Sequence, residues 1–105
     1  MKQIDPEQLL ALMADGSLDE AQLVDVREQE EWDYYHLGEA ELIPMQTIPG
    51  RLGEIARDKP VYVICAHGVR SMMVCRFLEE NSVGDVINVN GGMAAVASLR
   101  GFQYD

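Results

Sequence analysis

Residues 61–80 read VYVICAHGVRSMMVCRFLEE, a strand pattern followed directly by a helix pattern. Val61 to Ile64 form a short apolar run, β-branched and aromatic, that comes straight after Pro60. Such a run is typical of a buried strand in a parallel sheet. From Val69 to Glu80, apolar and charged side chains are spaced as in a mostly buried helix. Cys65 therefore stands where a strand ends and a helix begins.

This junction favours an ionised sulfur at Cys65. Backbone N–H groups in the first turn of a helix lack partners, and the helix dipole adds a partial positive charge. A short loop that curls into this end can direct several N–H groups at one sulfur, which favours the thiolate over the thiol. Arg70 adds a full positive charge nearby, and Gly68 allows a tight backbone turn. The pattern predicts a nucleophilic cysteine, whereas an isolated cysteine after a strand is more often a buried apolar residue.

Three stretches of the chain, in order, carry motifs that occur together in one family. Leu23 to Leu37 contains Asp-Val-Arg-Glu, then Glu-Trp, then His-Leu. Cys65 to Ser71 reads cysteine-x-x-glycine-x-arginine followed by serine, and Val89 to Met93 contains a glycine pair. This set resembles the signature of the rhodanese-like sulfurtransferases, and the resemblance spans about residues 6–99.

The resemblance implies an α/β fold, a rhodanese-like three-layer domain with a central parallel sheet of about five strands and helices on both faces. Alternating strand and helix patterns with short connections favour the same class. All 105 residues are expected to form this single domain. The expected strands lie near residues 3–4, 21–26, 41–44, 61–64 and 86–89, and the expected helices near 5–15, 28–35, 47–57, 69–80 and 93–99.

For the site, the resemblance implies that Cys65 is the catalytic nucleophile and carries the transferred sulfur as a persulfide. It also implies that the loop binds the substrate through Ala66, His67, Gly68, Val69, Arg70 and Ser71. Asp25 and Arg27 follow a neighbouring strand, and ligands bind beyond the carboxyl ends of parallel strands. These two residues are expected to brace the loop or attract an anion, or else to form a strand-end ion pair with a helix cap.

The expected substrates are a small-molecule sulfur donor, thiosulfate or a similar compound, and a thiol or cyanide acceptor. Related enzymes that favour mercaptopyruvate tend to have threonine at the position of Arg70, so thiosulfate is the expected donor. A sulfur relay or protein-binding module, whose acceptor is a partner protein, remains an alternative. A tyrosine phosphatase or arsenate reductase needs five residues between cysteine and arginine, but only four separate Cys65 from Arg70.

Composition excludes several classes of partner. The net charge is −10 at pH 7, which argues against nucleic acid and anionic membranes, because both need a basic surface. Two cysteines without Cys-x-x-Cys spacing predict no metal site, and no cofactor is expected. Residues 1–8 lack an apolar signal segment and no apolar run could span a membrane, so a cytoplasmic location is expected.

Several expectations concern packing. Cys75 lies ten residues after Cys65, well into the expected helix, and is expected to be a core residue rather than a resolving thiol. Trp32 is also expected in the core. Gly91 and Gly92 are expected where a turn needs positive φ. In the family an aromatic residue usually stands at the position of Val96, and Phe102 or Tyr104 is a candidate to fill that space.

Overall fold

The computed structural model describes residues 1–104, and its centre is a sheet of five strands that all run parallel. The strand order is β1-β5-β4-β2-β3. The strands are β1 (Lys2–Ile4), β2 (Gln22–Asp25), β3 (Glu41–Leu42), β4 (Val61–Ile64) and β5 (Val86–Val89). The helices are α1 (Pro6–Ala14), η1 (Ser17–Glu20), α2 (Gln29–Tyr34), η2 (Met45–Glu54), α3 (Val69–Glu80) and α4 (Gly92–Leu99), of which η1 and η2 are 3-10 helices. The predicted α/β class with a five-stranded parallel sheet is confirmed.

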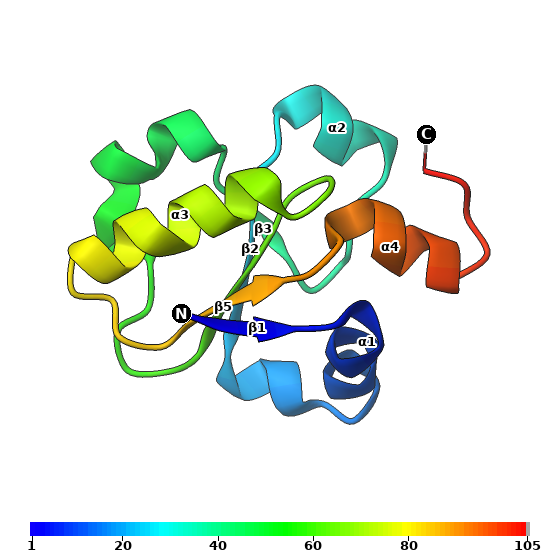
Figure 1. The fold of residues 1–105 in the computed structure, drawn as a ribbon, viewed down its shortest axis with the longest axis horizontal. Coiled ribbons are helices and arrows are strands. Elements are labelled where there is room, and N and C mark those ends of the chain that lie inside the picture. Colours follow the sequence, from blue (N-terminus) through cyan, green and yellow to red (C-terminus); the bar gives the residue numbers. More distant parts are fainter. Residues whose placement is uncertain (105) are drawn as a thin grey trace.

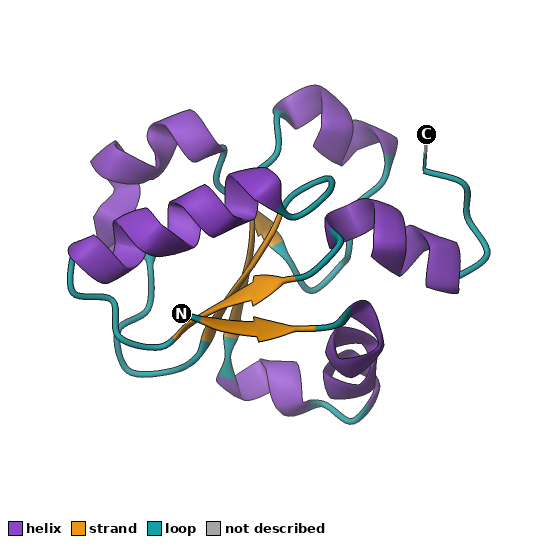
Figure 2. Ribbon diagram, in the orientation of Figure 1, coloured by secondary structure: helices purple, strands orange, loops and turns teal. Residues whose placement is uncertain are grey.

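Helices cover both faces of the sheet, which gives three layers (Figures 1 and 2). On one face α3 and η2 enclose a core that includes Val61 and Val63 of the central strand. On the other face α1 and α4 pack over a second core that includes Ile64. Successive side chains of a strand point to opposite faces. Cys65 continues the alternation of Val61 and Val63, so its side chain lies on the side of α3.

The parallel sheet brings the carboxyl ends of its strands to one edge. Asp25 at the end of β2 is the register partner of Ile64 at the end of β4. The N–H group of Val26 donates to the carbonyl of Ile64 at 3.0 Å, so the chain after β2 runs beside the chain after β4. Segments far apart in the sequence therefore meet next to Cys65.

The turn between β5 and α4 lies directly against the loop after β4. The N–H group of Met93 donates to the carbonyl of Cys65 at 2.7 Å, and that of Ala94 donates to the carbonyl of Ala66 at 3.0 Å. Gly91 and Gly92 have φ of +74° and +62°, which confirms the predicted need for glycine. At Gly92 there is a second constraint, because a Cβ atom would lie 2.4 Å from the carbonyl oxygen of Cys65.

Two local expectations differ from the structure. A helix occupies most of the segment expected over 47–57, but it is the 3-10 helix η2, which runs from Met45 to Glu54 and contains Pro49 and a non-helical Arg51. Proline has no N–H group to donate within a helix, so it disfavours a regular α-helix there. Trp32 is not a core residue: it is half-buried and stacks on the ring of His36, with centroids 3.8 Å apart.

Val96 is fully buried in the second core. Tyr104 packs against that core, and Phe102 stacks on Tyr35 with ring centroids 4.6 Å apart. Phe102 and Tyr104 thus contribute aromatic rings to this side of the protein, where Val96 stands in place of the usual aromatic residue.

Replacement of Gly92 by alanine is expected to lower the free energy of unfolding by about 2–4 kcal/mol, because the new Cβ meets loop backbone and the positive φ disfavours alanine. Urea denaturation of the variant measures this change. Gly38→Ala is the matched control, since nothing lies within 4 Å of its Cβ position. Equal stability of the two variants would contradict this account of the turn.

Candidate active site

The active-site loop, residues 65–71, connects β4 to α3 and surrounds the sulfur of Cys65. Gly68 adopts φ of +95° and is the residue before the first turn of α3. Its N–H group donates to the Sγ atom at 3.0 Å, and the Oγ atom of Ser71 lies 3.3 Å from the same sulfur. The side chain of Cys65 is only 1% exposed, so the sulfur lies beneath the loop rather than on an open surface. The sequence predicts several N–H donors around the sulfur, whereas within residues 1–104 one N–H group, that of Gly68, donates to it directly.

Ser71 connects the sulfur to a residue that sequence reasoning missed. Its buried hydroxyl donates to the Oδ1 atom of Asn88 at 2.5 Å. The side-chain amide of Asn88 in turn donates to the carbonyl of Gly68 at 3.4 Å. Asn88 is 1% exposed and lies in β5 between apolar neighbours. A polar residue within an otherwise apolar strand was the available signal for this contact.

Arg70 is bound to Glu31 rather than directed at the sulfur. Its two terminal nitrogens each donate to one carboxylate oxygen of Glu31 at 2.8 Å. The hydrogen bonds from Arg70 lower the pKa of Glu31 to about 2, and the N–H group of Glu28 also donates to this carboxylate. The Glu31 carboxylate in turn raises the pKa of Arg70. The pair therefore fastens the start of α3 to α2.

Asp25 and Arg27 form a buried ion pair at the end of β2. Both side chains are completely buried, and the Nη2 atom of Arg27 lies 2.7 Å from the Oδ2 atom of Asp25. The same guanidinium donates to the hydroxyl of Tyr104 at 2.7 Å and to the carbonyl of Tyr35 at 2.8 Å. These contacts match the strand-end ion pair rather than a group that attracts an anion from solvent.

The remaining loop residues differ in exposure. Ala66 is buried, and its carbonyl accepts the bond from α4. His67 and Val69 are exposed, and the ring of His67 meets the edge of Tyr104 with centroids 6.4 Å apart. His67 and Val69 are therefore the loop side chains best placed to meet a substrate.

Cys75 lies in the core beneath α3. Its side chain is completely buried, and burial raises the pKa of the Cys75 thiol to about 12. This is the structural position expected from its spacing. Within residues 1–104 no three histidine, cysteine or acidic side chains are grouped so as to hold a metal, and no helix has the length and apolar character needed to cross a membrane.

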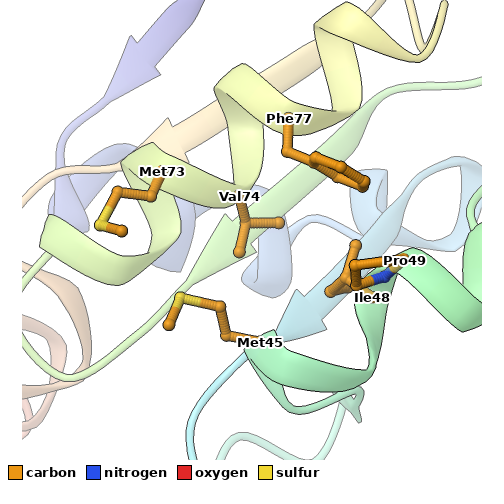
Figure 3. Close-up of a pocket in the computed structure, with 6 residues that line it drawn as sticks. All are labelled: Met45, Ile48, Pro49, Met73, Val74 and Phe77. Atoms are coloured by element: carbon orange, nitrogen blue, oxygen red, sulfur yellow. The ribbon is translucent and has the colours of Figure 1, made fainter.

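An apolar groove lies between α3 and η2 (Figure 3). Its volume is about 200 Å³, and Figure 3 shows side chains of the two helices pointing toward one another across it. Met73 is 53% exposed at this groove, one turn of α3 after the exposed Val69. The residues that line the groove are Met45, Ile48, Pro49, Met73, Val74 and Phe77.

The protein is therefore of the α/β class, with a parallel sheet and a thiol in the loop that leads from β4 to α3. The family model of the rhodanese-like domain matches residues 5–99. This chain belongs to the rhodanese-like domain family.

The relatives are similar over most of the chain. A sulfurtransferase of Allochromatium vinosum is 35% identical over 97 residues, which is 92% of this chain and 89% of the relative. Thiosulfate sulfurtransferase GlpE of Pseudomonas syringae is 33% identical over 91 residues, which is 87% of this chain and 82% of the relative. A rhodanese-like domain protein of Staphylococcus aureus has a crystal structure with a TM-score of 0.82 at 40% identity, covering 91% of each chain. Family and relatives together support sulfur transfer as the general chemistry.

The Glu31–Arg70 pair is expected to make the free energy of unfolding depend on pH in the acid range. Because the folded protein lowers the pKa of Glu31 from 4.5 to about 2, the pair contributes fully above pH 4.5 and its contribution is lost as the pH falls toward 2. Urea denaturation at several pH values should show a stability gap between wild type and Glu31→Gln that closes in this range. Glu30→Gln removes a neighbouring exposed charge and is the control. A gap of constant size would contradict the assignment.

The two thiols are expected to differ in reactivity. In the native protein at about pH 8, iodoacetamide should modify Cys65 and leave Cys75 intact, because a thiol with a pKa near 12 is almost entirely protonated there. Peptide mass mapping after brief exposure measures both sites. In guanidinium the two should react alike. Modification of Cys75 before Cys65 in the native protein would refute the assignment.

Proposed function

We propose that this protein is a sulfurtransferase of the rhodanese type, an enzyme that moves sulfane sulfur from thiosulfate or a similar donor to a thiophilic acceptor through a persulfide on Cys65. The observation that supports this most directly is the place of the Cys65 sulfur. It lies at the N-terminal end of α3, accepts the N–H group of Gly68 and is adjacent to the hydroxyl of Ser71. These contacts suit an anionic sulfur.

The first step forms the persulfide. The Cys65 thiolate attacks the outer sulfur of thiosulfate, a new sulfur–sulfur bond forms, and the bond to the sulfonate sulfur breaks. Sulfite leaves with the bonding electrons, and the negative charge remains on the terminal sulfur of the persulfide. Such a covalent intermediate divides one displacement into two.

The second step returns the free cysteine. An acceptor thiolate or cyanide attacks the terminal sulfur, and the Cys65 thiolate is the leaving group. With cyanide the product is thiocyanate. The α3 dipole and the Gly68 N–H group stabilise the negative charge that is present on sulfur before and after each displacement.

The residues around Cys65 have separate tasks in this proposal. Ser71 places its hydroxyl oxygen beside the sulfur, and Asn88 holds that hydroxyl in place by accepting its O–H. His67 and Val69 are the exposed side chains that meet donor and acceptor. Arg70 closes the loop onto Glu31, while Asp25 and Arg27 tie the end of β2 to Tyr35 and Tyr104.

A second candidate is a sulfur relay whose acceptor is a partner protein. The observation that favours it is the exposed apolar surface beside the loop, where Val69 and Met73 are 69% and 53% exposed. A phosphatase or arsenate reductase is disfavoured, since the arginine of such an enzyme holds the oxyanion whereas Arg70 is bound to Glu31.

Incubation with thiosulfate is expected to add the mass of one sulfur atom to Cys65, and cyanide should remove it. Intact-mass and peptide-mass spectrometry measure both changes. Cys65→Ala should acquire no sulfur, whereas Cys75→Ser should acquire as much as the wild type, because Cys75 is completely buried and makes none of the hydrogen bonds around the Cys65 sulfur. A sulfur adduct that persists in Cys65→Ala would refute the assigned nucleophile.

A further inference from the structure

Both arginines of the site are already neutralised by carboxylates. Arg27 is completely buried against Asp25. Arg70 donates to both carboxylate oxygens of Glu31, and about 30% of each of these two side chains is exposed, 31% and 29% respectively. A bidentate pair of this kind has strong geometric preference and no net charge. An incoming anion must therefore compete with a carboxylate for either guanidinium.

The Glu31–Arg70 pair persists at neutral pH. Arginine stays protonated in proteins, and the pKa of Glu31 is lowered to about 2 by the hydrogen bonds from Arg70. The N–H group of Glu28 fixes the same carboxylate at 2.9 Å. Arg70 is also within electrostatic reach of the reactive sulfur, because negative charge on Cys65 contributes to the raised pKa of Arg70, after the larger effect of Glu31. A change of charge at Glu31 therefore alters the electrostatic potential at the place where a donor binds.

Sulfane donors differ in the charge that they bring to this place. Thiosulfate carries two negative charges, and its sulfonate end needs a cation that Arg70 would supply if Glu31 did not occupy it. Thiosulfonates and persulfides offer the same outer sulfur with one negative charge. The net charge of −10 adds to the cost of bringing in a dianion.

The rim of the loop also offers apolar contact to a larger donor. Val69 is 69% exposed in the first turn of α3, and Met73 is 53% exposed one turn later. An aromatic or alkyl group attached to the donor can pack on these side chains, and removing such surface from water is favourable. The small sulfonate of thiosulfate gains nothing there.

We propose that Glu31 is a specificity-determining residue of this site: by occupying Arg70, it makes the protein favour sulfane donors with one negative charge and an apolar substituent over thiosulfate. This inference rests on the proposed sulfur transfer at Cys65 and names the donor class. Glu31 acts through Arg70 and does not itself contact the donor, so it is a positioning residue.

The test compares two donors on three proteins at physiological ionic strength, where screening by salt is constant. The donors are thiosulfate and toluenethiosulfonate. With either donor the Cys65 thiolate takes the outer sulfur, and sulfite or toluenesulfinate leaves with the bonding electrons. The proteins are wild type, Glu31→Gln and Glu30→Gln. Both variants lose one charge from α2, but only the first releases Arg70, and glutamine can still accept the N–H group of Glu28.

The wild type is expected to have the higher kcat/KM for toluenethiosulfonate, with cyanide as acceptor. Glu31→Gln should raise kcat/KM for thiosulfate about tenfold, mainly through KM, because one unpaired charge then faces a dianion. Its effect on toluenethiosulfonate should be several-fold smaller. Glu30→Gln should leave the ratio of the two donors unchanged.

Two results would overturn the inference. One is a folded Glu31→Gln protein with the donor ratio of the wild type. The other is a wild type that favours thiosulfate, and this comparison decides the matter even if the variant fails to fold. Failure of both donors to load sulfur onto Cys65, read by mass, is a different result, and it would refute the proposed function itself.

Discussion

The site depends on one close backbone contact, in which the start of α4 donates two N–H groups to the carbonyls of Cys65 and Ala66. This contact is possible only because residue 92 has no side chain, since a Cβ atom there would lie 2.4 Å from the carbonyl oxygen of Cys65. With those two carbonyls directed at α4, the chain must turn back at Gly68 before α3 begins. The sulfur then lies inside the turn, within reach of the Gly68 N–H group.

Side-chain contacts fix the loop from two other directions. On one side Ser71 and Asn88 connect α3 to β5 through buried hydrogen bonds. On the other side Arg70 and Glu31 connect α3 to α2. Within residues 1–104 no buried side-chain nitrogen or oxygen lacks a hydrogen-bond partner. The loop therefore holds its shape through complete polar pairing rather than through apolar packing alone, as buried polar networks require.

Local sequence predicted those features that depend on neighbours in the chain. The strand–loop–helix unit around Cys65 follows from the apolar run, the glycine and the helical spacing that surround it, and the positive φ of Gly91 and Gly92 follows from residue type. The three family motifs added the five-stranded sheet. A proline within η2 shows how a local rule also limits prediction, because Pro49 was expected at or near the start of a helix and lies instead inside the 3-10 helix.

Pairing between distant residues could not be predicted in the same way. Arg70 meets a carboxylate 39 residues away, and Ser71 meets an amide 17 residues away. Charge and hydrogen-bonding capacity are visible in the sequence, but the choice among many acidic residues depends on where the fold places α2 relative to the start of α3. The stacking of Trp32 on His36 at the surface is another outcome of packing, because His36 lies beyond the end of α2.

The hydrogen bond between Arg27 and Tyr104 gives the last described residues a role in the interior of the protein. Tyr104 satisfies one terminal nitrogen of a guanidinium that is completely buried, 77 residues earlier in the chain. A fragment trimmed where the family match stops, at residue 99, would leave that nitrogen with only its longer hydrogen bond, 3.3 Å, to the carbonyl of Glu31. The contacts of the fold therefore extend beyond residue 99, where the family match stops.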